Sequence, residues 1–218
     1  MTIRVLVADD QEAVRTGFRM ILDSEPDIEV VAEASDGETA VRQAVALRPD
    51  VIVMDIRMPG LDGIEATRLL AGRTVPRPQR IVVVTTYDTD QNVYTALRAG
   101  AVGFLLKDAG PSLLVDAVRQ AHHGESLIAP TVLLRLLQHW SAGRPPDPAG
   151  GAPTEALTAR ERDVVRAVAR GRTNAELADE FAISISTVKT HLAGVQRKLA
   201  ARNRTEIAIW AWENGYVR

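Results

Sequence analysis

The stretch from Val51 to Gly60 reads VIVMDIRMPG, and it is the part of the sequence that most clearly indicates the fold. Four apolar residues lead directly into a carboxylate, Asp55, and a Met-Pro-Gly sequence follows two residues later. A short continuous apolar run is typical of a strand that a parallel sheet buries on both faces. Pro-Gly is typical of a turn. This stretch therefore predicts an inner strand that ends at a carboxylate.

Similar apolar or β-branched runs lie on both sides of this stretch, at Ile3–Ala8, Val30–Ala34, Ile81–Thr85 and Gly103–Leu106. They alternate with helical patterns near residues 12–23, 37–47, 62–71, 89–99 and 111–122. Five such β-α units predict an α/β fold, a doubly wound parallel five-stranded sheet. Sheets of this kind bind ligands beyond the carboxyl ends of their strands, at the point where the strand order reverses.

Polar side chains follow several of the predicted strands, at the end where such a ligand would bind. Asp9 and Asp10 follow the first strand, Asp55 follows the third, Thr85 ends the fourth and Lys107 follows the fifth. Clustered carboxylates suit a hard cation that keeps some of its waters, most plausibly Mg²⁺. A carboxylate beside that cation can act as a nucleophile toward phosphorus. The set predicts a magnesium-dependent phosphoryl site.

Taken singly, the same residues have simpler explanations. Asp9 and Asp10 could end a strand and cap the next helix, Asp55 could begin a turn, and Lys107 could be a solvated surface residue. Only three of the 26 basic residues are lysines, however, so a lysine at a predicted strand end suggests a need for a compact charge. The combination of these residues, rather than any one of them, favours the phosphoryl site.

Residues 1–122 resemble the receiver domain of bacterial two-component response regulators. The resemblance rests on four motifs, VADD at 7–10, VMDIRMPG at 53–60, VTT at 84–86 and GFLLK at 103–107. One departure is Asp108, at a position where receivers often carry proline. It leaves open whether the peptide bond between Lys107 and Asp108 is cis or trans.

The receiver resemblance implies a role for each residue of the predicted site. It implies that Asp55 accepts a phosphoryl group from a sensor histidine kinase and that Asp10 and Asp55 bind Mg²⁺. It also implies that Asp9 acts through metal-bound water and that the Arg57 backbone carbonyl completes the metal shell. Lys107 and Thr85 would contact the phosphoryl oxygens. Phe104 would change its packing as Thr85 moves.

Two classes of enzyme use a carboxylate at the end of a strand, and the sequence lacks a motif that each of them requires. Aspartate-nucleophile phosphatases of the haloacid dehalogenase type need a second Asp two residues after the nucleophile, and Arg57 stands at that position. A P-loop ATPase needs G-x-x-x-x-G-K-[ST], which occurs nowhere in the chain. We therefore expect no enzyme, and an aspartyl phosphate that persists as a signal.

The composition predicts two domains with different partners. The 218-residue chain has a net charge of -2 and no cysteine, which excludes disulfides and thiolate metal sites. Residues 141–153 read SAGRPPDPAGGAP, typical of a linker. We expect a receiver domain at 1–125, a linker helix (the apolar segment 129–140) and Pro/Gly-rich linker at 126–153, and a small all-α domain at 154–218. No apolar run approaches a membrane span, which predicts a cytoplasmic protein without a membrane partner.

The charges of the two halves differ in sign. Residues 1–120 hold 13 basic and 18 acidic side chains, a balance of -5, and residues 154–218 hold 11 and 8, a balance of +3. In the positive half, Val188, Leu192, Val195 and Leu199 form one apolar helical stripe, preceded by a short helix over 173–181. A helix–turn–helix with a polar outer face fits the DNA major groove. A small helical bundle with a solvated face would give the same pattern.

Residues 154–218 resemble the LuxR-type helix-turn-helix domain, through LTARER at 157–162, NAELA at 174–178 and STVKTHL at 186–192. The whole chain thus resembles response regulators of the NarL/FixJ class. The resemblance implies a transcription regulator that dimerises on phosphorylation and binds promoter DNA, with RNA polymerase as a further partner. The implied DNA contacts are Thr187, Lys189, Thr190, Arg197 and Lys198.

Two further expectations concern the same domain. Ala193 stands where some relatives carry a basic or polar groove residue, and it offers only apolar contact, for example with a thymine methyl. Ile207 and Trp210 are expected at a dimer surface of the last helix, although Trp210 could equally belong to the core. An alternative function remains open, a DNA-binding protein whose receiver is only a dimerisation scaffold and is never phosphorylated.

Overall fold

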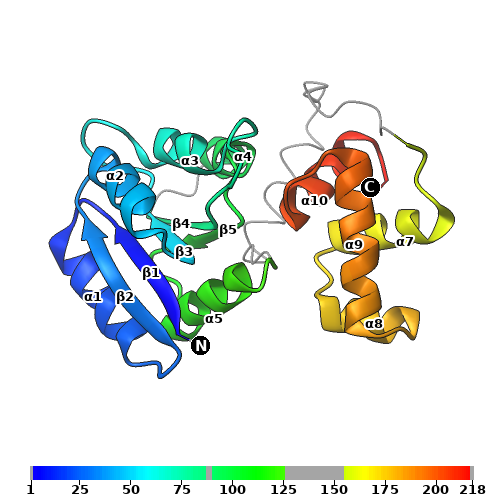
Figure 1. The fold of residues 1–218 in the computed structure, drawn as a ribbon, viewed down its shortest axis with the longest axis horizontal. Helices are drawn as coiled ribbons and strands as arrows, with labels where there is room; N and C mark the ends of the chain where they lie inside the picture. The colour runs from blue at the N-terminus through cyan, green and yellow to red at the C-terminus, as the bar shows by residue number, and fades with distance from the viewer. Residues whose placement is uncertain (1, 87–89, 126–154, 217–218) are drawn as a thin grey trace. The chain divides into compact units, whose positions relative to one another are not determined.

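The computed structural model describes residues 2–86, 90–125 and 155–216. The chain forms two compact units, and each is described by itself (Figure 1). The predicted linker helix at 129–140 and the Pro/Gly-rich linker lie outside the described residues. Among the described residues, no helix has the length and apolar character needed to cross a membrane.

The first unit is a five-stranded parallel sheet with helices on both faces, as the sequence predicts. The strand order is β2-β1-β3-β4-β5, so the order reverses between β1 and β3. The elements are β1 (Ile3–Ala8), α1 (Glu12–Asp23), β2 (Ile28–Ala34), α2 (Gly37–Leu47), β3 (Val51–Met54), α3 (Gly63–Ala71), β4 (Ile81–Thr85), α4 (Asp90–Ala99), β5 (Gly103–Leu106) and α5 (Pro111–His122).

The two faces of this sheet are covered by different helices. In Figure 1, α1 and α5 lie on one side of the sheet, and α2, α3 and α4 lie on the other. Alternate residues of the strands, such as Val5, Val53 and Val84, pack with Leu22 of α1 and Val118 of α5 into one apolar core. The alternation leaves the remaining strand residues to face α2–α4.

The strand and helix boundaries agree closely with the predicted ranges, except in β2. This strand begins at Ile28, two residues before the predicted start, where Ile28 pairs with Ile3. Glu29 is exposed and interrupts the apolar run, so the sequence pattern begins only at Val30. The early start reflects an edge strand with one solvated face.

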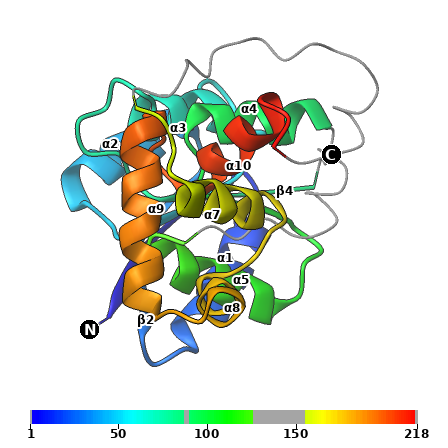
Figure 2. The ribbon, with the colours of Figure 1, turned by 90° about the vertical axis from the view of Figure 1, so that its right-hand side faces the viewer.

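The second unit consists of four helices, α7 (Ala159–Ala169), α8 (Asn174–Phe181), α9 (Ile185–Leu199) and α10 (Arg204–Glu213). In Figure 2, α9 crosses next to α7, with α8 at one end. Capping boxes begin α7 and α8, at Thr158 with Glu161 and at Thr173 with Glu176. Ser184 caps α9 by accepting a hydrogen bond from the Thr187 N–H.

Candidate functional site

Three carboxylates meet at the carboxyl edge of the sheet, where the strand order reverses. Asp9 and Asp10 follow β1, and Asp55 follows the adjacent strand β3. Asp9 and Asp55 are 1% and 4% exposed, whereas Asp10 is exposed. One oxygen from each carboxylate lies within 4.8 Å of the others. The sequence-predicted acidic site is therefore formed in the folded chain.

Lys107 reaches this cluster from β5 and contacts both buried carboxylates. Its Nζ lies 2.6 Å from Asp9 Oδ2 and donates a hydrogen bond of 2.8 Å to Asp55 Oδ2. The Lys107 N–H also donates to the Thr85 carbonyl, at 2.9 Å, which fixes the start of the side chain beside β4. The ammonium of Lys107, which follows β5, thus joins the ends of the adjacent strands β1 and β3.

Burial and charge shift the pKa values of two groups in this cluster. Burial, reinforced by the charge of Asp55, raises the pKa of Asp9 although Lys107 and the Gln11 N–H hydrogen-bond to its carboxylate. Burial alone would lower the pKa of Lys107. The hydrogen bond to Asp55 and the ion pair with Asp9 outweigh it, so the pKa of Lys107 is raised. The lysine therefore stays charged at neutral pH.

The donor set fits a magnesium ion. Mg²⁺ prefers oxygen ligands at about 2.1 Å, so ligands on opposite sides of one ion lie about 4.2 Å apart. The three oxygens span a comparable distance, within 4.8 Å, and a water between the ion and one carboxylate would accommodate the difference. Receiver domains bind Mg²⁺ at such an acidic site. The Arg57 carbonyl remains a predicted ligand.

Thr85 and Phe104 lie on the same face of the sheet, the one covered by α3 and α4. Phe104 pairs with Val83, and Thr85 follows Val83 by two residues, so the two side chains point to one side. Both are fully buried. Thr85 ends β4 between the strands that carry Asp55 and Lys107. These two residues therefore connect the acidic site with the packing under α4.

The loop from Asp55 to α3 is held by close backbone contacts at two glycines. The Gly63 N–H donates to the Ile56 carbonyl at 2.8 Å, and a Cβ on Gly63 would overlap the carbonyl oxygen of Asp55. A Cβ on Gly37, at the start of α2, would likewise overlap the carbonyl oxygen of Leu61. These contacts fix the backbone that carries Asp55.

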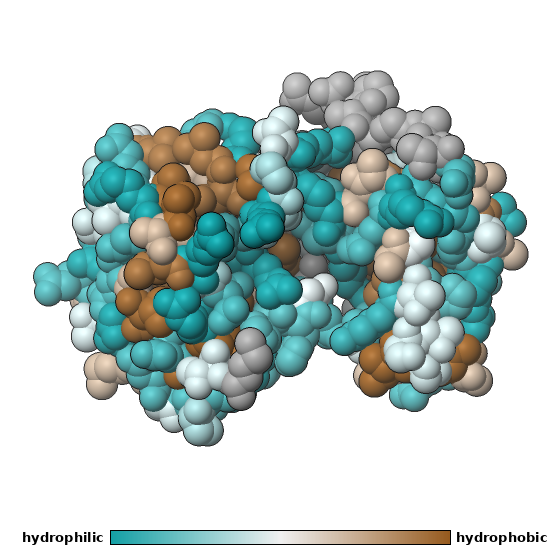
Figure 3. Space-filling model, in the orientation of Figure 1, coloured by the Kyte–Doolittle hydropathy of each residue, from teal (hydrophilic) through white to brown (hydrophobic). Residues whose placement is uncertain are grey.

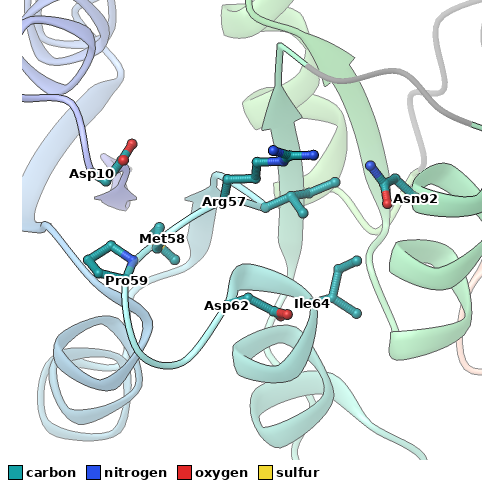
Figure 4. Close-up of a pocket in the computed structure, with 8 residues that line it drawn as sticks. Asp10, Arg57, Met58, Pro59, Asp62, Ile64 and Asn92 are labelled. Carbon is teal, nitrogen blue, oxygen red and sulfur yellow. The ribbon is translucent and has the colours of Figure 1, made fainter.

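A pocket of about 560 Å³ opens beside the acidic cluster, between this loop and α4. Figure 4 shows the Arg57 side chain extending from the loop toward Asn92 of α4, with Asp10 on the other side of the loop. Arg57 is exposed, unlike Asp55 two residues earlier. The pocket therefore lies beside the exposed carboxylate of the acidic cluster, Asp10.

The outer face of α9 carries most of the predicted DNA contacts. Lys189, Thr190 and Arg197 are exposed, and Thr187 is half-buried. Val188, Leu192 and Val195, on the opposite face, are buried in the core of the second unit, with Leu199 packed against it. In Figure 3, pale side chains of intermediate hydropathy run along α9. This arrangement of faces is the one that the sequence predicts.

Lys198 is placed differently from its predicted role as a DNA contact. It is 8% exposed, and its Nζ donates to Glu161 Oε2 at 2.8 Å and to the Ala156 carbonyl at 3.3 Å. Glu161 belongs to the capping box of α7, so the ion pair joins the start of α7 to the end of α9. A phosphate contact would require this pair to break, and the DNA contact of Lys198 stays a prediction.

The predicted dimer residues Ile207 and Trp210 are also placed differently. They are 0% and 5% exposed and belong to the core cluster of the second unit, together with Val164 and Leu177. The Trp210 ring lies 5.1 Å from the Tyr216 ring. The expectation that Ile207 is exposed on α10 is wrong, because it packs within its own unit, and Trp210 occupies the core position that the sequence left open as its alternative.

Two residues that sequence reasoning missed support the sites. Arg15 of α1 donates to the Asp9 carbonyl at 2.8 Å and pairs with Glu33 of β2, which steadies the β1–α1 loop. Its position six residues after Asp9, on the first turns of the following helix, was the available signal. Glu161 begins α7 through its capping box, and its partner Lys198 lies 37 residues away in the sequence, so no local signal could have shown the pair.

Comparisons with known proteins agree with both halves of the chain. Residues 5–119 match the response regulator receiver domain family, and residues 155–211 match the luxR family of bacterial regulatory proteins. The chain belongs to the NarL/FixJ class of two-component response regulators. Its function is that of a transcription regulator with a receiver and a LuxR-type DNA-binding domain.

Individual relatives match over nearly the whole chain. It is 42% identical over 219 residues to the transcriptional regulatory protein LiaR of Bacillus subtilis, covering 99% of each. It is 35% identical to the response regulator VraR of Staphylococcus aureus, covering 100% of each. The crystal structure of the response regulator ChrA, from a heme-sensing two-component system, has 41% identity and a TM-score of 0.54 over 99% of each chain.

Proposed function

We propose that this chain is a cytoplasmic switch in which a sensor histidine kinase phosphorylates Asp55, after which the chain dimerises and binds promoter DNA. The observation that carries this proposal is the position of Lys107 Nζ, 2.6 Å from Asp9 and 2.8 Å from Asp55. Burying two carboxylates and an ammonium costs free energy. Such buried charged clusters are therefore typical of functional sites. A dimerisation scaffold has no use for such a cluster.

The chemistry is a transfer of one phosphoryl group. A carboxylate oxygen of Asp55 attacks phosphorus, a P–O bond forms as the P–N bond of the phosphohistidine breaks, and the electron pair stays on the leaving imidazole. Mg²⁺ held by Asp9, Asp10, Asp55 and the Arg57 carbonyl would neutralise the phosphoryl oxygens during transfer. Lys107, already at the Asp55 carboxylate, then pairs with a phosphoryl oxygen.

We expect the product to persist, because the residue two positions after Asp55 is not a carboxylic acid. Arg57 stands where a turnover phosphatase would carry its general acid, so the aspartyl phosphate is a signal rather than a step in an enzymatic cycle. Thr85 hydrogen-bonds to the phosphoryl group, and Phe104 repacks on the same face of the sheet. The two arrangements form a two-state element whose populations phosphorylation shifts.

The output is DNA binding by two copies. One second unit carries an excess of only three positive charges, so a single copy binds DNA weakly. Thr187, Lys189, Thr190 and Arg197 face the DNA, and the dimer uses surfaces other than Ile207 and Trp210. Half-sites about 34–36 Å apart match a two-fold dimer. A dimer on promoter DNA is then in position to contact RNA polymerase.

Intact mass after incubation with acetyl phosphate and Mg²⁺ tests the switch, with oligomer size measured in the same sample. We expect one added phosphoryl group and a shift toward dimer, both absent in Asp55→Asn and after removal of Mg²⁺ by EDTA. Phosphoryl addition that persists in Asp55→Asn contradicts the assignment of Asp55. No addition, with a dimer already present, supports the scaffold alternative.

A further inference from the structure

The exposed face of α9 is not uniformly polar. Its exposed positions follow a helical stripe, and they are Ile185, Ser186, Lys189, Thr190, Ala193 and Arg197. Ile185 is the first residue of α9, and its 49% exposure is unusual for a large hydrophobic side chain. It is the only one classed as exposed among the described residues of the second unit. Figure 3 shows hydrophobic side chains reaching the surface where α8 meets the start of α9.

Core packing does not account for Ile185. Ile183, two residues earlier, packs against the core cluster of the second unit, whereas Ile185 is not part of that cluster. The cap of α9 is supplied by Ser184, so Ile185 is not needed to begin the helix. Isoleucine is also a poorer helix former than Glu or Gln, which would suit an exposed first turn. The exposed Ile185 side chain is therefore unfavourably hydrated, and it does not stabilise the second unit by packing.

The hydroxyl groups around Ile185 already make hydrogen bonds within the helix. Ser184 Oγ accepts from the Thr187 N–H at 3.1 Å and lies 2.9 Å from Thr187 Oγ1. The Thr190 hydroxyl donates to the Ser186 carbonyl at 3.1 Å. These contacts reduce the hydrogen-bonding capacity that the first turns of α9 offer to bases. Among these polar side chains, Ile185 is the exposed aliphatic side chain at the start of the helix.

We propose that Ile185 is a specificity-determining residue that contacts the 5-methyl group of a thymine in the major groove. The proposal rests on the proposed function, because it requires the start of α9 to enter that groove. The N-terminal residues of a recognition helix are those that reach base edges. Thymine is the only base that presents a methyl group there, and apolar side chains recognise it. Lys189 and Arg197 on the same stripe supply the charge that holds the helix against DNA.

Replacing thymine by deoxyuridine tests this contact, because it removes the methyl group and nothing else. The full chain, treated with acetyl phosphate and Mg²⁺, first selects its preferred duplex from a random pool. Each thymine of that duplex is then replaced singly by deoxyuridine, and Kd is measured for the wild type, Ile185→Ser and Ile185→Ala. Met20→Ser serves as the matched control, since Met20 is a 70% exposed hydrophobic residue on α1.

We expect one thymine in each half-site at which deoxyuridine weakens wild-type and Met20→Ser binding about fourfold, the effect of burying one methyl-sized group. At that position, Ile185→Ser and Ile185→Ala should each bind the duplex with thymine and the duplex with deoxyuridine with the same Kd. Sensitivity that survives in both variants, or wild-type binding that no replacement weakens, overturns the proposal and leaves DNA binding intact. Failure of the wild type to enrich any duplex overturns the proposed function and this inference together.

Discussion

Lys198 and Arg197 are neighbours in α9 with opposite surroundings. The Arg197 side chain is exposed on the outer face, whereas Lys198 is buried against Glu161. A side chain that neutralises a phosphate contributes about -0.9 to the slope of log K against log salt concentration. The two residues can therefore be distinguished by the salt dependence of DNA binding, even if both substitutions weaken it.

For Arg197→Met we expect a shallower salt slope, by about 0.9 for each copy of the chain bound. Lys198→Met should reduce affinity with the slope unchanged, because its ammonium positions α9 and does not contact DNA. Fluorescence anisotropy of a labelled duplex over a series of salt concentrations measures both. An equal loss of slope in the two variants would restore Lys198 as a phosphate contact.

Gly63 gives a second prediction for a single residue. In most helices, replacing an exposed glycine by alanine stabilises the protein. At the first position of α3 the added methyl group overlaps the Asp55 carbonyl, so Gly63→Ala should destabilise the first unit by about 1–3 kcal/mol. Urea unfolding followed by circular dichroism measures the change. Gly17→Ala, in the interior of α1 with nothing within 4 Å, is the control and should be neutral or stabilising.

Among the elements, the contact between α7 and α9 depends on the Glu161–Lys198 pair. Burial would raise the pKa of Glu161, but hydrogen bonds from Lys198 and from the Thr158 N–H lower it below its ordinary value of 4.5. A lowered carboxyl pKa stabilises the folded state above the unfolded pKa. That contribution is lost as the pH falls from about 4.5 through the lowered folded pKa.

Glu161→Gln keeps the hydrogen-bonding shape of the cap but leaves Lys198 charged without its carboxylate. We expect a loss of about 3 kcal/mol at pH 7, since breaking a buried pair on one side is costly. The difference from the wild type should shrink below pH 4.5, as Glu161 itself becomes protonated. Tryptophan fluorescence reports this unit through Trp210 and Trp212 during urea unfolding. A difference that is constant from pH 7 to pH 3.5 would contradict the ionic contribution.

The elements themselves could be predicted because local signals define them. Apolar runs give the strands of the first unit, and capping boxes give the helix starts of the second. The acidic site followed from the topology, which brings Asp9, Asp55 and Lys107 together once the strands are parallel. The surroundings of Lys198 and Trp210 could not be predicted, because helical periodicity shows which residues share a face but not which distant element covers it.

For the whole molecule, the proposed switch predicts that phosphorylation changes affinity only where two copies can bind. On a duplex with two half-sites about 10 base pairs apart, acetyl phosphate should increase affinity at least tenfold. On a duplex with one half-site it should have little effect. Electrophoretic mobility shift of both duplexes measures this, with Asp55→Asn as the control. An equal gain on both duplexes would indicate release of a covered α9 rather than dimerisation.

The ion pairs of Lys107 with Asp9 and Asp55 have a further consequence for a variant that cannot be phosphorylated. Asp9 and Asp55 carry two negative charges and Lys107 one positive charge, so the buried trio retains a net charge of -1. Asp55→Asn removes that excess and keeps the Lys107–Asp9 pair, so the substitution should not destabilise the fold. The Asp55→Asn variant should therefore be at least as abundant in the cell as the wild type. In a cell that holds both, it would compete for the kinase, so the substitution is expected to be genetically dominant.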